Sequence, residues 1–182
     1  MGFLEDAQRR EAWDLIEGEI PEVAAADWKP PNRLLPPGDE LHQALAIKTL
    51  RERRSSGRYD FLTSEQLNAM AKDTLDTGLN AEEDITQEAG VYIFVSLIPP
   101  ETLKVGETEG LRRRVGREHM RYGHGHTDSN LCAYFTNRGY DWPRRISDKE
   151  IVALAFPLPG SSELERKAIE KGLRSLLNPE MP

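Results

Sequence analysis

The sequence is poor in cysteine, since Cys132 is the only one among its 182 residues. A single cysteine excludes an internal disulfide framework and a zinc site built from clustered cysteines, and we expect it to be a small buried residue. Long apolar runs are also absent, because no stretch approaches the roughly 18 consecutive apolar residues of a membrane-spanning helix. The first residues lack the basic and then apolar layout of a secretory signal. We therefore expect no membrane span and a cytoplasmic location.

Charge is plentiful but unevenly distributed. The formal net charge is −7, yet residues 1–89 hold 19 acidic and 10 basic side chains, whereas residues 90–182 hold 12 acidic and 14 basic ones. Because physiological salt screens electrostatic fields beyond roughly 8 Å, a polyanion responds to the nearest patch of charge and not to the net charge. The acidic composition therefore does not exclude a nucleic-acid partner.

The densest basic segment is LKVGETEGLRRRVGREHMRYGHGH, residues 103–126. It holds three acidic side chains, three histidines and six basic residues, namely Lys104, Arg112, Arg113, Arg114, Arg117 and Arg121. Two interpretations stay open on charge alone: a phosphate-binding surface, or a solvated helix with intrahelical ion pairs. His124 and His126 lack a third ligand nearby, so we do not expect a zinc site there.

The first half of the chain predicts helices separated by helix-breaking residues. Apolar residues at helical intervals predict an amphipathic helix over residues 3–20, and two Pro pairs predict an extended linker over 27–39. A second helix is expected from Asp39 to residues 55–57. A third begins at Thr63, whose spacing to Gln66 is that of a capping box. Residues 1–87 are thus predicted to be a helical N-terminal region for dimerisation or DNA contact, with a basic cluster formed by Arg51, Arg53, Arg54 and Arg58.

The second half, residues 88–182, predicts a small α+β domain. Strand signals over 90–97 and 102–107, separated by a Pro-Pro turn, predict an antiparallel hairpin. A helix is expected over 110–121, a long loop over 122–147, a buried strand over 151–156 and an amphipathic helix over 161–177. The expected fold is a three-stranded antiparallel sheet flanked by helices and preceded by the helical N-terminal region.

The order of several short motifs resembles that of the GIY-YIG nuclease domain over about half of the chain. The matching residues are Gly90 to Tyr92, Lys104 to Gly106, Thr108, Leu111, Arg114 and, on the last helix, Glu165. The family usually has a tyrosine where this chain has Lys104, and a lysine there is similar to a variant among GIY-YIG restriction endonucleases. The family also places an asparagine just past a final proline, and Asn178, before Pro179, is the candidate for that part.

The resemblance implies a metal-dependent DNA endonuclease with Tyr92, Lys104, Arg114, His119 and Glu165 in its active site. The Tyr92 hydroxyl would lie on the path by which the attacking water loses its proton, Arg114 would bind a phosphate with its guanidinium fork, and His119 would accept or relay a proton. Lys104 would either lower the pKa of Tyr92 or hold the scissile phosphate. His119 follows Arg114 at one residue more than the common family spacing.

Glu165 is the implied ligand of Mg²⁺ or Mn²⁺. Magnesium tolerates a single protein carboxylate when water and substrate phosphate supply its other ligands. The spacing of Ser162 and Glu165 is also that of a capping box, which gives the same glutamate a purely structural interpretation, and Glu163 is the rival carboxylate.

Basic and amide side chains around the motifs are predicted to contact double-stranded DNA, namely Arg112, Arg113, Arg117, Asn130, Asn137, Arg138, Arg144 and Arg145. Asparagine and arginine form bidentate hydrogen bonds with adenine and guanine edges, which favours sequence-specific recognition. Together with this composition, the resemblance implies a type II restriction-like enzyme, and cutting both strands with one active site per chain suggests a homodimer. The alternatives are a repair or mobile-element nuclease of the same family and a nucleic-acid-binding module that does not cleave.

Overall fold

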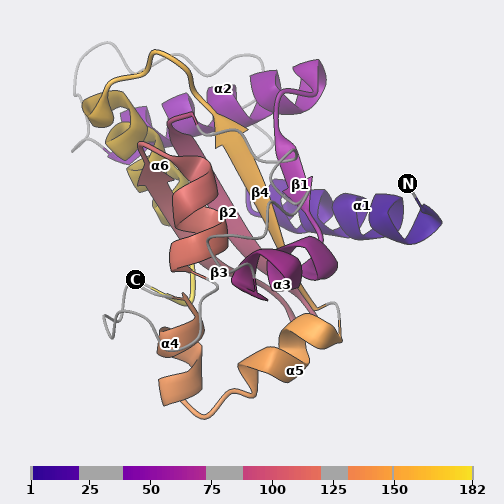
Figure 1. The fold of residues 1–182 in the computed structure, drawn as a ribbon. Helices are drawn as coiled ribbons and strands as arrows, with labels where there is room; N and C mark the ends of the chain where they lie inside the picture. The colour runs from indigo at the N-terminus through magenta and orange to yellow at the C-terminus, as the bar shows by residue number, and fades with distance from the viewer. Residues whose placement is uncertain (1, 21–38, 73–87, 120–130, 149, 182) are drawn as a thin grey trace.

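The computed structural model describes residues 2–20, 39–72, 88–119, 131–148 and 150–181 (Figure 1). In chain order its elements are α1 (Phe3–Gly18), α2 (Asp39–Ser56), β1 (Asp60–Leu62), α3 (Ser64–Lys72), β2 (Gly90–Leu97), β3 (Pro100–Thr108), the π-helix η3 (Arg112–Glu118), α4 (Leu131–Asn137), α5 (Trp142–Ser147), β4 (Ile151–Pro157) and α6 (Glu163–Leu177). The α+β class is therefore confirmed. Among the described residues, no helix combines the length and the apolar character needed to cross a membrane.

The strands form one antiparallel sheet in the order β1-β4-β2-β3. The hairpin of β2 and β3 and the buried strand β4 agree with the sequence prediction. The predicted number of strands was wrong, because β1 adds a fourth strand whose Phe61 pairs with Leu154 of β4. A strand of three residues is too short to show the alternation that identifies strands in a sequence, and its pairing with β4 and the burial of Phe61 and Leu62 depend on distant parts of the chain.

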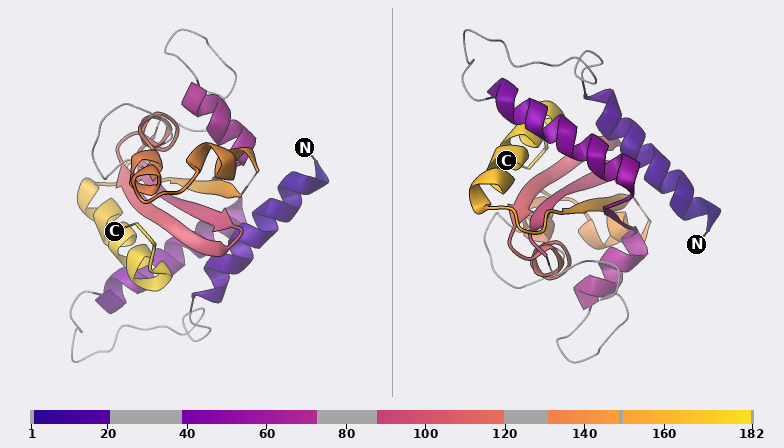
Figure 2. Two further views of the ribbon diagram at one scale, coloured as in Figure 1. Left: turned by 90° about the horizontal axis from the view of Figure 1, so that it is seen from below. Right: turned by 90° about the horizontal axis from the view of Figure 1, so that it is seen from above.

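Both faces of the sheet are covered, so two apolar cores form (Figure 2). Successive residues of a strand point to opposite faces. Val91, Ile93 and Val95 of β2 therefore pack with residues of α1, α2 and α6, whereas Tyr92 and Phe94 pack with residues of α3, η3, α4 and α5. Helices α1 and α2, in the first half of the sequence, thus share a core with β2 and β4.

The helix boundaries follow from local hydrogen bonds. The Thr63 backbone N–H donates to Gln66 Oε1 at 2.8 Å, and the Gln66 N–H donates to Thr63 Oγ1 at 3.2 Å, which confirms the predicted capping box at the start of α3. At the other end of the chain, Asn178 terminates α6 in the left-handed conformation, with φ of 43°, which asparagine tolerates better than most residues.

The described part of residues 122–147 contains two short helices, so the prediction of one long loop was wrong there. Helices α4 and α5 carry Phe135 and Trp142, whose rings stack with centroids 5.6 Å apart and an interplanar angle of 6°. Both rings are buried in the core that also holds Cys132. Tertiary packing, and not a long periodic pattern, therefore stabilises these helices. The predicted extended linker at 27–39 lies almost wholly outside the described residues.

The segment after α6 covers the outer edge of β3. The backbone N–H groups of Glu180 and Met181 donate to the carbonyl oxygens of Thr102 and Leu103 at 3.0 and 2.9 Å. The Tyr134 hydroxyl donates to the Glu180 carbonyl oxygen at 3.2 Å. These bonds satisfy part of an otherwise open strand edge next to Lys104.

Candidate active site

Tyr92 and His119 form the buried centre of the candidate site. The Tyr92 hydroxyl lies 2.7 Å from His119 Nε2, and the two residues are 1% and 0% exposed. The backbone N–H of Leu131 donates to His119 Nδ1 at 3.2 Å, so Nδ1 acts as an acceptor. A neutral imidazole carries one proton, which is then on Nε2, and this N–H donates to the Tyr92 oxygen.

The electrostatic surroundings keep His119 neutral. Burial, followed by the positive charges of Arg114 and Lys104, lowers the pKa of His119 well below 6.5. The ring therefore has little capacity to take up a proton near neutral pH. The geometry therefore favours His119 as a hydrogen-bond donor that holds the Tyr92 oxygen. The sequence had predicted instead that His119 accepts or relays a proton.

Arg114 reaches the same oxygen from η3. Its Nε donates to the Tyr92 hydroxyl oxygen at 3.4 Å, and its Nη1 donates to Glu118 Oε2 at 2.6 Å. The other oxygen of Glu118 accepts from Arg113 Nε at 3.2 Å, although the Arg113 side chain is 68% exposed. Glu118 thus orients Arg114 while the guanidinium keeps part of its surface accessible.

The π-helical register of η3 explains why both side chains converge on Tyr92. The His119 N–H bonds to the Arg114 carbonyl oxygen at 3.1 Å, a bond that spans five residues. In an α-helix, residues five apart point about 140° away from each other, whereas the wider π-helix brings them to one face. His119 follows Arg114 by five residues, and the π-helix accommodates this spacing without separating the two side chains.

Gly106 makes room for the tyrosine. It is the direct partner of Tyr92 in the β2–β3 ladder, and a Cβ at Gly106 would overlap the Tyr92 hydroxyl oxygen and the ring carbon that carries it. Only glycine permits this close approach. The glycine of the Lys104 to Gly106 motif thus has a specific steric function.

Lys104 lies beside this centre on the same face of the sheet. It pairs with Phe94, so it is the diagonal neighbour of Tyr92 across β2 and β3, and it is only 8% exposed. Burial, together with the charges of Arg174 and Arg114, lowers the pKa of Lys104 to about 8, while Glu170 opposes this shift. The amine can therefore change its protonation state near physiological pH.

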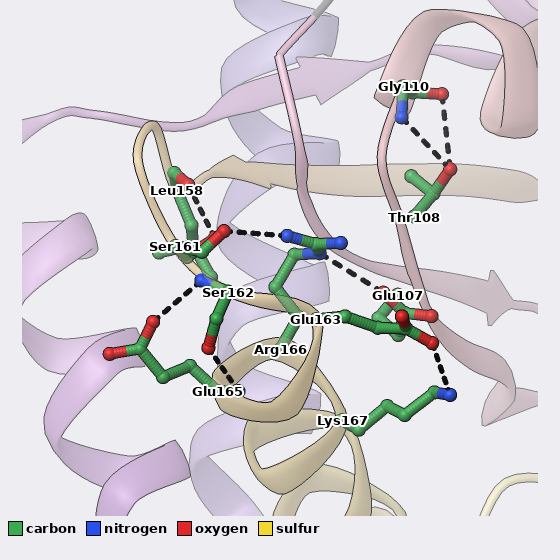
Figure 3. A network of polar contacts seen from close by, with 10 residues as sticks. All are labelled: Glu107, Thr108, Gly110, Leu158, Ser161, Ser162, Glu163, Glu165, Arg166 and Lys167. Atoms are coloured by element: carbon green, nitrogen blue, oxygen red, sulfur yellow. Dashed lines mark hydrogen bonds and ion pairs between the residues drawn. The ribbon is translucent and has the colours of Figure 1, made fainter.

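Glu165 does not face this centre. The Ser162 backbone N–H donates to Glu165 Oε2 at 2.7 Å and the Glu165 N–H donates to Ser162 Oγ at 3.2 Å (Figure 3). The glutamate is exposed and closes the capping box that was its structural interpretation. The rival, Glu163, is also exposed and pairs with Lys167.

Glu170 is the carboxylate on the side of α6 that faces β3. It lies one turn after Arg166, whose Nε is 3.1 Å from Glu107 Oε2 on β3 (Figure 3). Burial raises the pKa of Glu170, while the charges of Arg174 and Lys104 oppose the rise. Glu170 also contributes to the electrostatic surroundings of Tyr92. The prediction from the sequence missed it, because Glu165 and Glu170 differ only in the face of the helix that they occupy.

A divalent cation fits Glu170 only as a single-carboxylate site. The described ranges contain no group of three or more His, Cys, Asp or Glu residues able to hold a metal. A partly buried carboxylate surrounded by water and a phosphate suits Mg²⁺, which retains several waters when bound.

The predicted DNA-binding residues divide into accessible and buried ones. Asn137, Arg138 and Arg144 are exposed, and Arg112 is half-buried. Arg145 is a correction: its side chain is 10% exposed, it donates to Ser96 Oγ at 3.0 Å, and it pairs with Glu150 at 3.4 Å and Glu101 at 3.6 Å. A buried guanidinium with these partners is suited to stabilising the fold and not to contacting DNA. Asn130 and the side chain of Arg117 lie outside the described residues.

The basic cluster of the first half lies on a different face. Helix α2 packs against the face of the sheet opposite η3 (Figure 2). There Arg54 pairs with Glu17 at 3.0 Å and lies over the Trp13 ring, 4.9 Å from its centroid. This arginine therefore joins α2 to α1.

Tyr92, Lys104, Arg114, His119 and Glu170 together provide a phenol, an amine of lowered pKa, a guanidinium, a neutral imidazole and a carboxylate. Such a set can transfer protons and bind a phosphate group. No protein-family model, curated protein or solved structure matches the chain.

Proposed function

We propose that this chain is a metal-dependent DNA endonuclease of the GIY-YIG type that hydrolyses phosphodiester bonds. The proposal rests on one observation, the buried Tyr92 hydroxyl that lies within hydrogen-bonding distance of both His119 Nε2 and Arg114 Nε. Phosphodiester hydrolysis requires a proton acceptor for water, cations for the charge of the transition state and stabilisation of the leaving oxygen. The residues around Tyr92 offer a group for each requirement.

Tyr92 is the proposed acceptor of the proton from the attacking water. Burial raises its pKa to about 12, and the charge and hydrogen bond of Arg114 oppose that rise. The N–H of His119 adds a second donor to the same oxygen, which also favours the phenolate. As a neutral amine, Lys104, with its pKa near 8, would take the phenol proton once the two donors and the incoming cation had lowered the pKa of Tyr92 from about 12 toward that of the amine. The lowered pKa of Lys104 favours this role over permanent phosphate binding.

Glu170 replaces Glu165 as the proposed ligand of Mg²⁺ or Mn²⁺. Its carboxylate lies in the charge environment of Tyr92 and Lys104, whereas Glu165 is engaged in the cap of α6. The cation would supply positive charge for the phosphate and the leaving oxygen. Glu170 itself would hold and orient that charge at the edge of β3.

Double-stranded DNA is the proposed substrate. Arg113, Arg138 and Arg144 are exposed on η3, α4 and α5, the elements that cover the Tyr92 face of the sheet. Arginine side chains there suit contacts with the phosphate backbone or with base edges. Cleavage of both strands would require two copies of the chain, and Lys104 favours the restriction-like branch.

Plasmid cleavage with Mg²⁺ or Mn²⁺ tests the proposal. The wild-type chain should nick or linearise the plasmid, and Tyr92→Phe and Glu170→Gln should each lower the rate by about 10²-fold or more. Tyr134→Phe is the matched control for Tyr92→Phe, because it removes a hydroxyl from another buried tyrosine, which bonds to Glu180. Glu165→Gln is the matched control for Glu170→Gln, because it removes a carboxylate from the α6 cap. Both controls should cleave like the wild type.

The outcomes separate the alternatives. If the chain binds DNA but does not cleave it under any metal condition, the result would support a nucleic-acid-binding module and contradict the nuclease proposal. Loss of cleavage in Glu165→Gln but not in Glu170→Gln would identify Glu165 as the metal ligand. Discrete fragments from DNA of known sequence would support a restriction-like enzyme, and a smear would support a repair or mobile-element nuclease.

A further inference from the structure

Arg174 lies next to the proposed metal ligand but belongs to none of the motifs. It follows Glu170 by one turn of α6, and its Nη1 lies 3.7 Å from Glu170 Oε1. The side chain of Arg174 is 38% exposed and that of Glu170 is 21% exposed. The guanidinium is therefore close to the carboxylate, and both groups remain partly accessible to solvent and to an incoming cation.

The charges around Glu170 leave Arg174 as its main counter-ion. Lys104, Lys167 and Arg174 are positive and Glu107 is negative, and among these Arg174 has the largest effect on the carboxylate. Lys167 is engaged with Glu163 on the exposed side of the helix. A partly buried carboxylate requires a positive neighbour, since its desolvation is otherwise uncompensated.

We propose that Arg174 is a positioning residue that neutralises Glu170 in the metal-free protein and competes with the divalent cation for its carboxylate. The inference rests on the proposed function, in which Glu170 is the metal ligand. Two positive groups repel each other at one carboxylate, so the guanidinium has to move away when the cation binds. Arg174 thereby sets the metal affinity of the site.

Direct metal binding tests this role without any cleavage assay. The full chain, free of DNA, is titrated with Mn²⁺ at fixed pH, and electron paramagnetic resonance measures the free Mn²⁺. Arg174→Met should lower the Kd of the Glu170-dependent site by about three- to tenfold, the effect of losing one partly exposed ion pair and a repulsive charge. Arg174→Lys keeps the charge and should stay within about twofold of the wild type.

Lys171→Met is the matched control. It removes one positive charge from the neighbouring exposed position of the same helix, and Lys171 is not among the charges that shift the pKa of Glu170. Its Kd should be unchanged within about twofold, since exposed charges are well screened. Glu170→Gln identifies the site by abolishing it. Circular dichroism checks that each variant folds, and Arg174→Gln replaces Arg174→Met if the latter does not.

The results distinguish the inference from the proposed function. Glu170-dependent binding with equal Kd values for the wild type and Arg174→Met overturns the inference alone. An equal gain in affinity from Lys171→Met also overturns it, because net charge would then explain the effect. Absence of any Glu170-dependent Mn²⁺ binding overturns both the inference and the assignment of Glu170 as the metal ligand.

Discussion

The carbonyl oxygen of Arg114 accepts a hydrogen bond from the backbone N–H of His119, five residues later, at 3.1 Å. This bond belongs to the π-helix η3, and it places the guanidinium and the imidazole on the same side of the backbone. Both side chains then reach the hydroxyl of Tyr92. π-helical turns are rare and occur frequently at functional sites, and here the turn aligns two donors with one oxygen.

The first prediction concerns the tautomer of His119. The ring should be neutral and protonated on Nε2 from about pH 6.5 to 8, because its pKa lies well below 6.5 and Leu131 N–H occupies Nδ1. Long-range ¹H–¹⁵N correlation spectra measure this directly. Protonation on Nδ1, or titration of the ring near pH 7, would contradict the donor role.

The same lowered pKa makes the fold sensitive to acid. Below about pH 6.5 the unfolded chain takes up a proton at His119 and the folded chain does not. The contribution of His119 to the free energy of unfolding therefore falls as the pH drops below that value.

The second prediction concerns Gly106. Gly106→Ala should displace the Tyr92 ring, destabilise the fold by about 1–3 kcal/mol and lower cleavage by about 10²-fold. Gly18→Ala is the control, because a Cβ there meets no atom within 4 Å, and it should be neutral or slightly stabilising. Thermal denaturation and plasmid cleavage measure both effects. Wild-type cleavage by Gly106→Ala would show that the position of the Tyr92 hydroxyl does not matter.

The third prediction is the pH dependence of Lys104. If the neutral amine accepts the phenol proton, the cleavage rate should rise as the pH passes through about 8, the lowered pKa of Lys104. Lys104→Arg remains charged and should lose this rise. Single-turnover rates between pH 6.5 and 9.5 provide the measurement. A wild-type rate that falls above pH 8 would instead assign Lys104 to phosphate binding.

Stability should change with pH in a related way. Folding lowers the pKa of Lys104 from 10.5 to about 8, so the charged form is penalised in the folded state. Below about pH 8 this penalty is complete, and it disappears as both states lose the proton. The free energy of unfolding contributed by Lys104 therefore rises from about pH 8 to about pH 10.5.

The fourth prediction compares two neighbouring arginines. Arg145→Met should cost about 1–3 kcal/mol, since Ser96, Glu101 and Glu150 lose a buried partner. Arg144→Met, with a side chain that is 76% exposed and paired with Asp148, should change stability by less than about 0.5 kcal/mol. Chemical denaturation measures both values. Equal, small effects would mean that the Arg145 contacts do not stabilise the fold.

Local patterns predicted most of the sheet. The strands β2, β3 and β4 follow short β-branched or unbroken apolar runs, the helix α6 follows an amphipathic pattern, and the capping boxes at Thr63 and Ser162 follow a fixed spacing. The elements that the pattern missed are short. Strand β1 requires β4 as a partner, and α4 and α5 require the stacked rings of Phe135 and Trp142.

The candidate site was predicted less completely. Tyr92, Lys104, Arg114 and His119 were all identified by their order in the sequence, and they gather on one face of the sheet. The sequence and the structure differ in the carboxylate: motif spacing selected Glu165, whereas the charges that act on Tyr92 and Lys104 favour Glu170 as the proposed ligand. Two glutamates on one helix become different only when a neighbouring strand distinguishes the faces of that helix.

The amino-acid sequence by itself determined the α+β class, the β2–β3 hairpin and the identity of the groups around Tyr92, because alternation, caps and residue order act over a few neighbouring positions. The tertiary structure decided that Glu170 and not Glu165 contributes to the electrostatic surroundings of Lys104, that Arg145 is buried and that η3 adopts a π-helical register. These features depend on contacts between segments that are distant in the chain, and such contacts exist only after the sheet and helices have packed.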